Sequence, residues 1–270
     1  MAFSLQQTRD ILKKLCISPN RKLGQNFLIE PAIVQKSLEW AHIQSNDVVI
    51  EIGPGCGTLT DSLFQTGAKI FAVEKDRGLY QHIAETFSID IIHADALDFP
   101  VGHFDLASPY KIVANLPYAV ASVWLDKILE LKRLPECMVL LVQKEAADRW
   151  FAAHSTKHFC ALGINLQAAY NLTEKCCVAK RYFYPQPGVD SSLVLLEKKQ
   201  DAFVFSKDFK QFIREAFIHR RQQIGRYCRE SLAVFSKDFL KYLNENHLKD
   251  TLRAEQIPLP FWINFAKMFI

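Results

Sequence analysis

The 270-residue chain has no run of apolar residues that approaches the roughly 18–20 needed to cross a membrane as a helix. Its start, Met1–Lys14, holds charged residues early and has no apolar core followed by a small-residue cleavage site. These absences argue against a membrane span and against a secretory signal. We therefore expect a soluble, cytoplasmic protein without membrane contact.

The number and the spacing of the cysteines argue against two further classes of protein. The seven cysteines are an odd number, and no two of them form a C-x-x-C pair. Neither a disulfide scaffold nor a zinc knuckle is expected from such a set. His154 and His158 are four residues apart but lack the companion Glu of a zincin helix. The sequence predicts a reduced chain that uses no metal.

Glycine and proline are also few, at 10 and 11 residues, and no internal repeat or low-complexity segment occurs. By contrast, 49% of the residues are hydrophobic, which is enough for a sizeable core. A chain of this length and composition fits one large domain or a main domain with a smaller appendage.

The net charge of +4 is small, but the cations are unevenly distributed. Between Lys198 and Arg229 there are nine Lys and Arg residues and three acidic ones. The N-terminal arm adds further cations, namely Arg9, Lys13, Lys14, Arg21 and Lys22. Two basic clusters that flank a balanced middle indicate phosphate contacts. The alternative is a solvated helical face without a partner.

Short apolar segments alternate with helical patterns through the first half of the chain. The predicted strands are Val48–Ile52, Lys69–Val73, Ile89–His93, Lys111–Ala114 and Cys137–Val142. Strands that alternate with helices at this spacing predict an α/β fold with a doubly wound, mostly parallel sheet. Residues 178–197 read as two more strands, interrupted by Phe183-Tyr184-Pro185-Gln186-Pro187, and are expected to form an antiparallel addition at the sheet edge.

From about Phe203 onward the pattern is helical only. We therefore divide the chain into residues 1–200 and a small all-helical C-terminal domain, residues 201–270. Tyr227, Trp262 and the phenylalanines of this region are expected to form the core of the small domain.

A glycine-rich turn, Gly53-Pro54-Gly55-Cys56-Gly57, directly follows the first strand and opens a helix. Such a turn lets a ligand approach the backbone closely, next to N–H groups at the start of a helix. The order is not the G-x-G-x-x-G of dinucleotide folds. Glu51 in the preceding strand would repel a pyrophosphate, but suits the cationic amino-acid end of S-adenosylmethionine.

Two more acids end the next two strands. Glu74 lies where a carboxylate accepts hydrogen bonds from both hydroxyls of a ribose, and Asp95 lies where one accepts from the amine of an adenine. Either acid alone is explained as well by a solvated loop. Three acids at successive strand ends after a glycine turn favour a cofactor site.

The fourth strand runs into Asn115-Leu116-Pro117-Tyr118. In open α/β sheets, ligands bind at the carboxyl ends of the strands. The Asn amide offers an acceptor for an exocyclic amine, and Tyr118 offers a face for stacking. An ordinary strand-ending turn is the alternative for these four residues taken alone.

Together these motifs resemble the ribosomal RNA adenine N6,N6-dimethyltransferases. The segments that carry the resemblance extend over nearly the whole chain and keep the order of the family. They are Gly24–Leu28, Glu51–Thr60, Glu74, Asp95–Leu97, Asn115–Tyr118, Val142–Glu145, Phe183–Pro187 with Val189–Ser192, and Ala216-Phe217 with Arg220-Arg221.

The resemblance implies a Rossmann-like class I methyltransferase domain in residues 1–200 and an RNA-binding domain in residues 201–270. It further implies dimethylation of N6 on two adjacent adenosines, in the loop of the 3′-terminal hairpin of 16S-type rRNA, during ribosome biogenesis. S-adenosylmethionine would be the methyl donor and S-adenosylhomocysteine the product, without a metal. The expected partner is the precursor of the small ribosomal subunit, and the enzyme is expected to be a monomer.

The resemblance also assigns residues. The cofactor-binding set is Gln25, Asn26, Leu28, Glu51, Gly53, Gly55, Glu74, Asp95, Ala96 and Asn115. The catalytic set, which holds the target adenine between the rings of Tyr118 and Phe183, is Asn115, Leu116, Pro117, Tyr118 and Phe183. The RNA-binding set is Arg21, Lys22, Arg220 and Arg221.

The chain departs from the family pattern at three places. Lys75 follows Glu74 where an apolar residue is common, and Ala94 replaces the usual Gly before Asp95. Both changes are expected to adjust cofactor affinity. Gln222-Gln223 follows the paired arginines where Lys and a small residue are usual, and this change is expected to adjust RNA contacts.

Two alternatives remain open. The first is the related large-subunit enzyme that methylates one adenine and confers antibiotic resistance, which shares the glycine turn and an Asn-Pro-aromatic motif. The second is a ribosome assembly factor that kept the fold and lost the chemistry.

Overall fold

The computed structural model describes residues 3–20, 24–105, 107–117 and 119–269. Its contacts divide the chain into two compact units. The sheet unit consists of Met1–Ala147 and Asn171–Lys198, and the helical unit of Asp148–Tyr170 and Lys199–Ile270. The segment Asp148–Tyr170, which precedes the boundary drawn from the sequence at residue 200, thus groups with the C-terminal helices.

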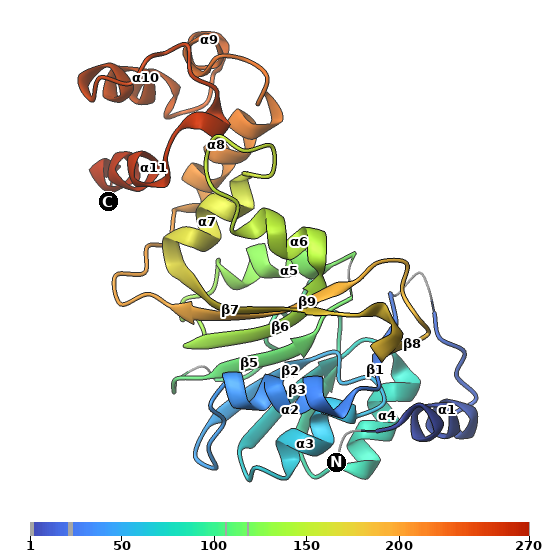
Figure 1. The fold of residues 1–270 in the computed structure, drawn as a ribbon. Coiled ribbons are helices and arrows are strands. Elements are labelled where there is room, and N and C mark those ends of the chain that lie inside the picture. Colours follow the sequence, from blue (N-terminus) through green and yellow to red (C-terminus); the bar gives the residue numbers. More distant parts are fainter. Residues whose placement is uncertain (1–2, 21–23, 106, 118, 270) are drawn as a thin grey trace. The chain divides into compact units, whose positions relative to one another are not determined.

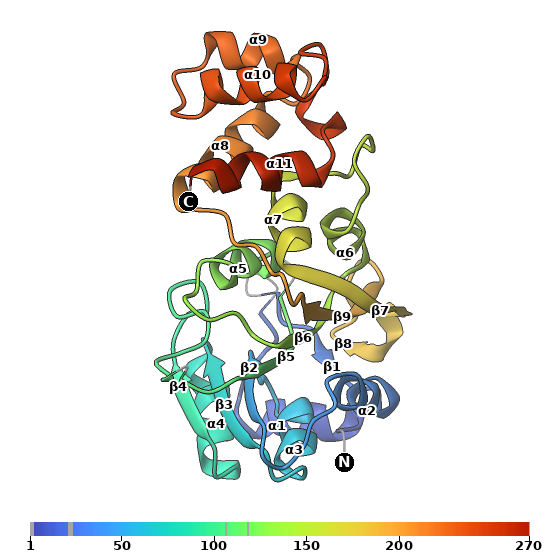
Figure 2. The ribbon, with the colours of Figure 1, turned by 90° about the vertical axis from the view of Figure 1, so that its left-hand side faces the viewer.

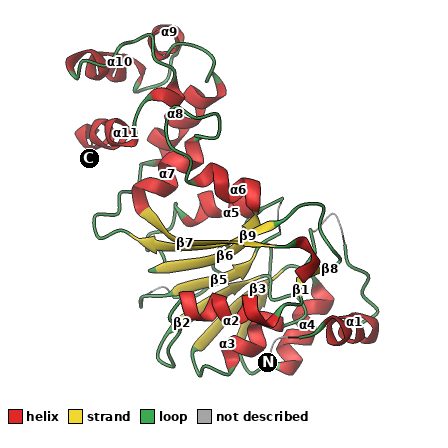
Figure 3. Cartoon of the chain, in the orientation of Figure 1, coloured by secondary structure: helices red, strands yellow, loops and turns green. Residues whose placement is uncertain are grey.

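The sheet unit contains a seven-stranded sheet in the order β4-β3-β2-β5-β6-β9-β7 (Figures 1 and 3). Its strands are β2 (Val48–Ile52), β3 (Lys69–Glu74), β4 (Asp90–His93), β5 (Lys111–Asn115), β6 (Cys137–Gln143), β7 (Tyr170–Val178) and β9 (Ser191–Lys198). The five strands from β4 to β6 are parallel, whereas β9 pairs with β6 in the antiparallel sense. The predicted doubly wound sheet with an antiparallel addition is confirmed.

The strand order reverses between β2 and β5, and this reversal locates the site. The chain moves outward in one direction through β3 to β4 and in the other from β5 to β6. Because parallel crossovers are right-handed, helices on the two sides of the reversal cover opposite faces. Ligands of open α/β sheets bind at the carboxyl ends of the strands beside this reversal.

Helices cover both faces of the sheet (Figures 1 and 2). The helices of this unit are α1 (Leu5–Lys14), α2 (Pro31–Trp40), α3 (Thr58–Phe64), α4 (Arg77–Thr86) and α5 (Ala121–Ile128), and α6 (Lys144–Trp150) extends across the unit boundary. On one face, α2 and α3 pack on β2, β5, β6 and β9 in one buried apolar cluster. On the opposite face, α5 buries Trp124, Leu125 and Ile128.

The edge of the sheet differs from the sequence prediction. The strand expected to start at Val178 lies earlier, as β7, and the residues after it form a short 3-10 turn, Lys180–Tyr182. Most of β7 is polar and exposed, since it borders solvent, so its sequence lacks the apolar pattern of the inner strands. A separate two-stranded sheet joins β1 (Phe27–Leu28) to β8 (Phe183–Tyr184).

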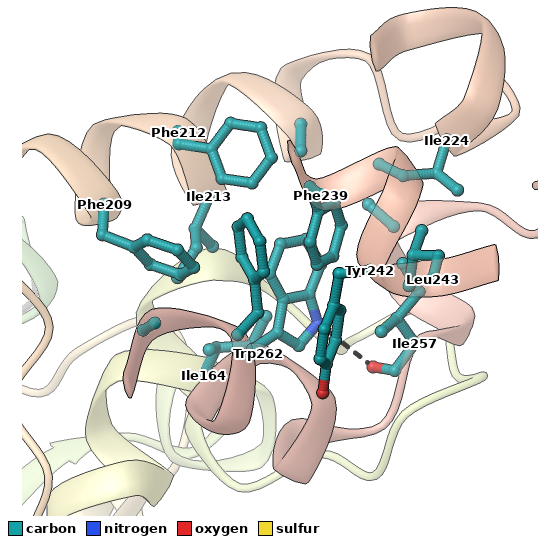
Figure 4. Close-up of a cluster of buried hydrophobic side chains, with 14 of the residues drawn as sticks. Ile164, Phe209, Phe212, Ile213, Ile224, Phe239, Tyr242, Leu243, Ile257 and Trp262 are labelled. Carbon is teal, nitrogen blue, oxygen red and sulfur yellow. Dashed lines mark hydrogen bonds between the residues drawn. The ribbon is translucent and has the colours of Figure 1, made fainter. Parts of the chain in front are cut away.

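The helical unit is held by an aromatic core (Figure 4). Its helices are α7 (Ala161–Ala169), α8 (Lys207–Ile218), α9 (Ile224–Glu230), α10 (Ser236–Glu245) and α11 (Leu259–Ala266). Trp262 is fully buried, stacks on Phe239 at 4.8 Å between ring centroids, and donates its indole N–H to the Ile257 carbonyl at 3.2 Å. Tyr227 belongs to the same cluster, and the phenylalanines of this region belong to it or are partly buried against it, except Phe269, which is 47% exposed. The predicted aromatic core is thus confirmed apart from Phe269.

The described part of the chain contains neither a candidate membrane span nor a cluster of metal-ligating side chains. None of the helices it contains is long and apolar enough to cross a membrane. Nor do three or more His, Cys, Asp or Glu side chains within residues 3–20, 24–105, 107–117 and 119–269 form a group that suits a metal ion.

Candidate active site

A cavity lies at the carboxyl ends of β2 to β5, in the sheet unit. All ten residues predicted to bind the cofactor line it: Gln25, Asn26, Leu28, Glu51, Gly53, Gly55, Glu74, Asp95, Ala96 and Asn115. Leu116 and Pro117 line it as well. The residues from Glu51 to Asn115 meet here because the parallel strands that carry or precede them all end at the same edge of the sheet. Gln25, Asn26 and Leu28 reach the cavity from the segment in and before β1.

The glycine turn forms one wall of the cavity. Gly53 has φ +70°, which glycine adopts without strain, and a side chain at this position would meet no atom within 4 Å. Gly55 also has a positive φ, and a Cβ there would lie 3.1 Å from the ring of Phe27. The missing side chain at Gly53 therefore leaves open space beside the backbone, as close approach of a ligand requires.

Glu74 ties this turn to the end of β3. Its Oε2 accepts a hydrogen bond from the Gly55 N–H at 3.0 Å, and its Oε1 accepts from the Asp76 N–H at 2.8 Å. The side chain is buried, and burial raises its pKa above the ordinary value. Each carboxylate oxygen has two lone pairs, so both keep capacity to accept from a diol.

Glu51 is the most deeply buried acid in the cavity wall. It is 1% exposed, and burial raises its pKa to about 8; the side chain of Thr60 opposes this rise, and the charge of Glu74 adds to it. Within the described residues its Oε2 has no hydrogen-bond partner, and neither does the buried hydroxyl of Thr58, which also lines the cavity. Buried polar atoms without partners are rare and indicate a missing ligand. A cationic group with N–H donors fits this pair.

Asp95 lies at the far end of the cavity, after β4. Its Oδ1 accepts from the Leu97 N–H at 2.9 Å, and its Oδ2 lies 2.6 Å from the Lys75 ammonium. The Lys75 hydrogen bond holds the pKa of this carboxyl below its usual range. Asp95 is therefore a charged acceptor at neutral pH, already paired with one cation.

Asn115 ends β5 and lines the cavity. Its Nδ2 donates to the Asn26 carbonyl at 3.0 Å. Because a carbonyl can only accept, this bond identifies the nitrogen end of the amide and leaves the oxygen to accept from a ligand. The Leu116 N–H donates to the Leu141 carbonyl at 3.1 Å, and the Pro117 carbonyl accepts from Val120 at the start of α5. The segment is fixed at both ends.

Of the two aromatic rings predicted to stack on the target adenine, the structure describes only that of Phe183. Tyr118 lies outside the described residues. Phe183 does not belong to the set of residues that line the cavity; it is 3% exposed and packs in the apolar cluster beneath β8. It pairs with Leu28 across the two-stranded sheet, and Leu28 does line the cavity. A clamp made by the two rings stays a prediction.

Of the four residues predicted to bind RNA, the structure describes two, Arg220 and Arg221. Arg21 and Lys22 lie outside the described residues. In the helical unit, the Arg220 guanidinium forms an ion pair with Glu255, to which its Nε donates at 2.8 Å, and its Nη2 donates to the Lys157 carbonyl at 3.0 Å. Arg221 is exposed. Arg220 is thus engaged within its own unit, whereas Arg221 faces solvent.

Asp76 is a cavity residue that the sequence reasoning missed. Its Oδ1 caps α4 by accepting from the N–H groups of Gly78 and Leu79, and its Oδ2 accepts from Gln25 Nε2 at 3.3 Å. An Asp just before a helix is a known N-cap signal, which would have placed it at this edge of the sheet. Its link to Gln25 had no signal in the sequence.

The chain matches known proteins over almost its full length. A sequence model of the family described as "Ribosomal RNA adenine dimethylase" matches residues 17–270. A protein of Opitutus terrae named "Ribosomal RNA small subunit methyltransferase A" is 42% identical over 263 residues, which cover 94% of this chain and 95% of that protein. A protein of the same name from Natranaerobius thermophilus is 33% identical over 99% of this chain and 96% of its own.

Solved structures show the same fold. A dimethyladenosine transferase from Plasmodium falciparum superposes with a TM-score of 0.72 at 24% identity, over 90% of this chain and 97% of that one. The 23S rRNA methyltransferase ErmE gives a TM-score of 0.65 at 20% identity, over 90% of this chain and 98% of its own. At 24% and 20% identity these two likenesses show the fold and do not identify the substrate of this chain.

Proposed function

The chain belongs to the ribosomal RNA adenine dimethylase family, and from this premise we propose that it dimethylates N6 of two adjacent adenosines in the 3′-terminal hairpin loop of small-subunit rRNA. The observation that carries the proposal is the position of Asn115. Asn115 lines the same cavity as the rest of the predicted cofactor-binding set, and because its nitrogen donates to the Asn26 carbonyl, its oxygen is the end of the amide that can accept from a ligand.

The cavity suits S-adenosylmethionine, which supplies a methyl group on a sulfonium. Glu74 would accept from the ribose hydroxyls and Asp95 from the adenine amine. Glu51, with an unpartnered oxygen, would face the cationic amino-acid end. Gly53 leaves the space through which the backbone approaches the ligand.

Asn115 and Leu116 would prepare the target amine for attack. The lone pair of an exocyclic amine is conjugated with the adenine ring, so the amine is a poor nucleophile. If the Asn115 amide oxygen and the Leu116 carbonyl accept its two N–H groups, the lone pair is turned toward the methyl group. In the transfer, the bond from methyl carbon to sulfur would break as the bond to N6 forms, and N6 would release one proton to solvent. Positioning of two reactants is worth about 7–11 kcal/mol, so a strong base is not required.

Covalent catalysis by the cavity's cysteine does not compete with this mechanism. Cys56 lines the cavity, but burial, followed by the charge of Glu74, raises the pKa of its thiol to about 12. The thiolate is the nucleophilic form of cysteine. Cys56 is therefore a protonated, apolar part of the wall at neutral pH.

We also propose that the partner is the precursor of the small ribosomal subunit, that the enzyme acts as a monomer in the cytoplasm, and that the helical unit contacts RNA. The relatives in Opitutus terrae and Natranaerobius thermophilus are named for the small subunit, which supports this substrate over the large-subunit alternative. Intact Glu74, Asp95 and Asn115 in one cavity favour an enzyme over an assembly factor without chemistry.

Transfer of tritium from labelled S-adenosylmethionine tests the function. Undermethylated small subunits, large subunits and free rRNA are incubated with the enzyme in parallel, and primer extension locates the methylated bases. We expect label in small subunits, at two adjacent adenosines. Label in large subunits would favour the resistance-type enzyme, and the absence of label from all three substrates would favour the non-catalytic assembly factor. Label in free RNA alone would contradict the subunit as substrate.

Substitutions at Phe183 can distinguish a ring that stacks on the target base from a ring that only packs in the core. A Phe183→Ala change would destabilise the protein by about 3–5 kcal/mol whether or not the ring stacks on a base, because Phe183 is buried. Phe183→Leu keeps an apolar side chain and removes only the ring. We expect this variant to methylate RNA about 5- to 100-fold more slowly, in line with the loss of one stacking contact, and to bind S-adenosylhomocysteine normally.

Phe71→Leu is the matched control for Phe183→Leu. Phe71 packs on Phe104 within the sheet unit and is not one of the cavity-lining residues. If both Leu variants keep full turnover, Phe183 is a core residue and the clamp does not include it.

The paired arginines are expected to differ in role. Arg220→Ala removes the partner of Glu255 and of the Lys157 carbonyl, so we expect the free energy of unfolding to fall by about 1–2 kcal/mol. Arg221→Ala is expected to change it by less than about 0.5 kcal/mol, because Arg221 is exposed. Conversely, Arg221→Ala should weaken binding to small subunits at low salt. Thermal unfolding and filter binding measure the two effects, and equal destabilisation by both changes would refute the division.

A further inference from the structure

Lys75 lies against the acid that the proposed function assigns to the cofactor adenine. It follows β3 directly, and its ammonium is 2.6 Å from Asp95 Oδ2, at the end of β4. Both side chains line the cavity, and their exposed fractions are 57% and 27%. The Lys75 backbone is held in place as well, because its carbonyl lies 3.1 Å from His93 Nε2.

The second oxygen of Asp95 is also in use. Its Oδ1 accepts from the Leu97 N–H, which orients the carboxylate. Each oxygen can still accept a second hydrogen bond, so the exocyclic amine of an adenine at this place would either share the Asp95 carboxylate with Lys75 or displace the ammonium.

We propose that Lys75 sets the base specificity of the cofactor site: its ammonium competes with the adenine amine for Asp95 and makes the site tolerant of a 6-oxopurine. The proposal rests on the proposed function, because it takes the adenosyl group to lie against Asp95. A bare carboxylate repels the oxygen of a 6-oxopurine, since both atoms are acceptors. With Lys75 beside it, the site offers a donor to that oxygen and an acceptor to the neighbouring ring N–H.

The expected magnitude follows from the exposure of the pair. Ion pairs at exposed positions contribute little, so removal of the competitor should strengthen binding of S-adenosylhomocysteine by about two- to fivefold. The 6-oxo analogue, S-inosyl-L-homocysteine, loses its donor and should bind about two- to fivefold more weakly. The ratio of the two affinities should then rise by roughly four- to 25-fold in favour of the adenine form.

Isothermal titration of wild type and Lys75→Met with both nucleosides measures this ratio. Lys69→Met is the matched control: Lys69 begins the same strand, is exposed, and lies at the end of β3 away from the cavity. It removes the same charge, so a general electrostatic effect on binding would appear in both variants. Lys75→Arg keeps the charge and should retain most of the wild-type tolerance.

The possible outcomes test the inference about Lys75 and the proposed function separately. If Lys75→Met binds S-adenosylhomocysteine more weakly than wild type, or if the ratio does not change, the inference about Lys75 is overturned while the cofactor site stands. If wild type binds neither nucleoside, the proposed function itself fails. Because salt weakens exposed ion pairs, the ratio for wild type should also rise between low and high salt, and that for Lys75→Met should stay constant.

Discussion

Asn115→Ala is expected to slow methyl transfer by at least about a hundred- to a thousandfold, the range found when one group that stabilises a transition state is removed. The variant loses the oxygen that accepts from the target amine, and it loses the Nδ2 bond to Asn26 that fixes the amide. Cofactor binding should fall by no more than about tenfold, because the other cavity residues remain and one lost hydrogen bond is worth about 0.5–1.5 kcal/mol.

Single-turnover transfer to undermethylated small subunits, with excess enzyme, measures the chemical step. Titration with S-adenosylhomocysteine and thermal unfolding show that the variant is folded and loaded. Asn115→Asp is an informative companion, since it keeps an acceptor oxygen but has no donor for the Asn26 carbonyl. Near-normal turnover in Asn115→Ala would show that Asn115 does not act on the target amine. Equal losses in transfer rate and cofactor affinity would show that Asn115 only binds the cofactor.

The part of the site that could be predicted from the sequence is the set of side chains at the carboxyl ends of the parallel strands. Val48–Ile52 is a run of apolar residues interrupted by one acid, and it forms β2 with the predicted bounds. Glu74, Asp95 and Asn115 end or follow strands that are parallel. Once these strands are identified, their carboxyl ends must meet at one edge, and the convergence of the side chains follows.

The sequence did not predict the ion pairs of the site and of the helical unit. Their partners are distant in the chain, and no periodic pattern of residues links them. The ion pair of Lys75 with Asp95 crosses 20 residues, and that of Arg220 with Glu255 crosses 35. A basic residue in a basic stretch looks available for RNA until its acidic partner is known.

The strand β7 was not predicted for a different reason. It lies at the edge of the sheet, where most of its side chains are exposed, so its sequence needs no run of apolar residues.

Glu51→Gln is expected to stabilise the protein without its cofactor, and to do so only above about pH 5, because the unfolded carboxyl titrates near 4.5. In the folded chain burial raises this pKa to about 8. Between these two values the folded chain holds a proton that the unfolded chain has released. Folding therefore takes up a proton, and the contribution of Glu51 to the free energy of unfolding falls by up to about 1.4 kcal/mol per pH unit. Above about pH 8 both states are ionised and the decline ends.

Glutamine has nearly the same shape and does not titrate, so the variant lacks this decline. Thermal unfolding of wild type and Glu51→Gln at pH 5 and pH 8 should give similar stabilities at pH 5. At pH 8 the variant should be more stable, by on the order of 2–4 kcal/mol. An equal difference at both pH values would show that Glu51 does not carry the proton.

The same substitution should weaken binding of S-adenosylmethionine. A cationic ligand beside Glu51 favours the ionised carboxylate, so the affinity of wild type should rise with pH up to about 8, while that of Glu51→Gln should be lower and nearly flat. Calorimetric titration over pH 6–8.5 distinguishes the two profiles. A variant that gains stability and loses affinity would show that the unpartnered carboxyl is retained for the ligand, because it destabilises the empty site and becomes favourable only when a cation compensates its charge.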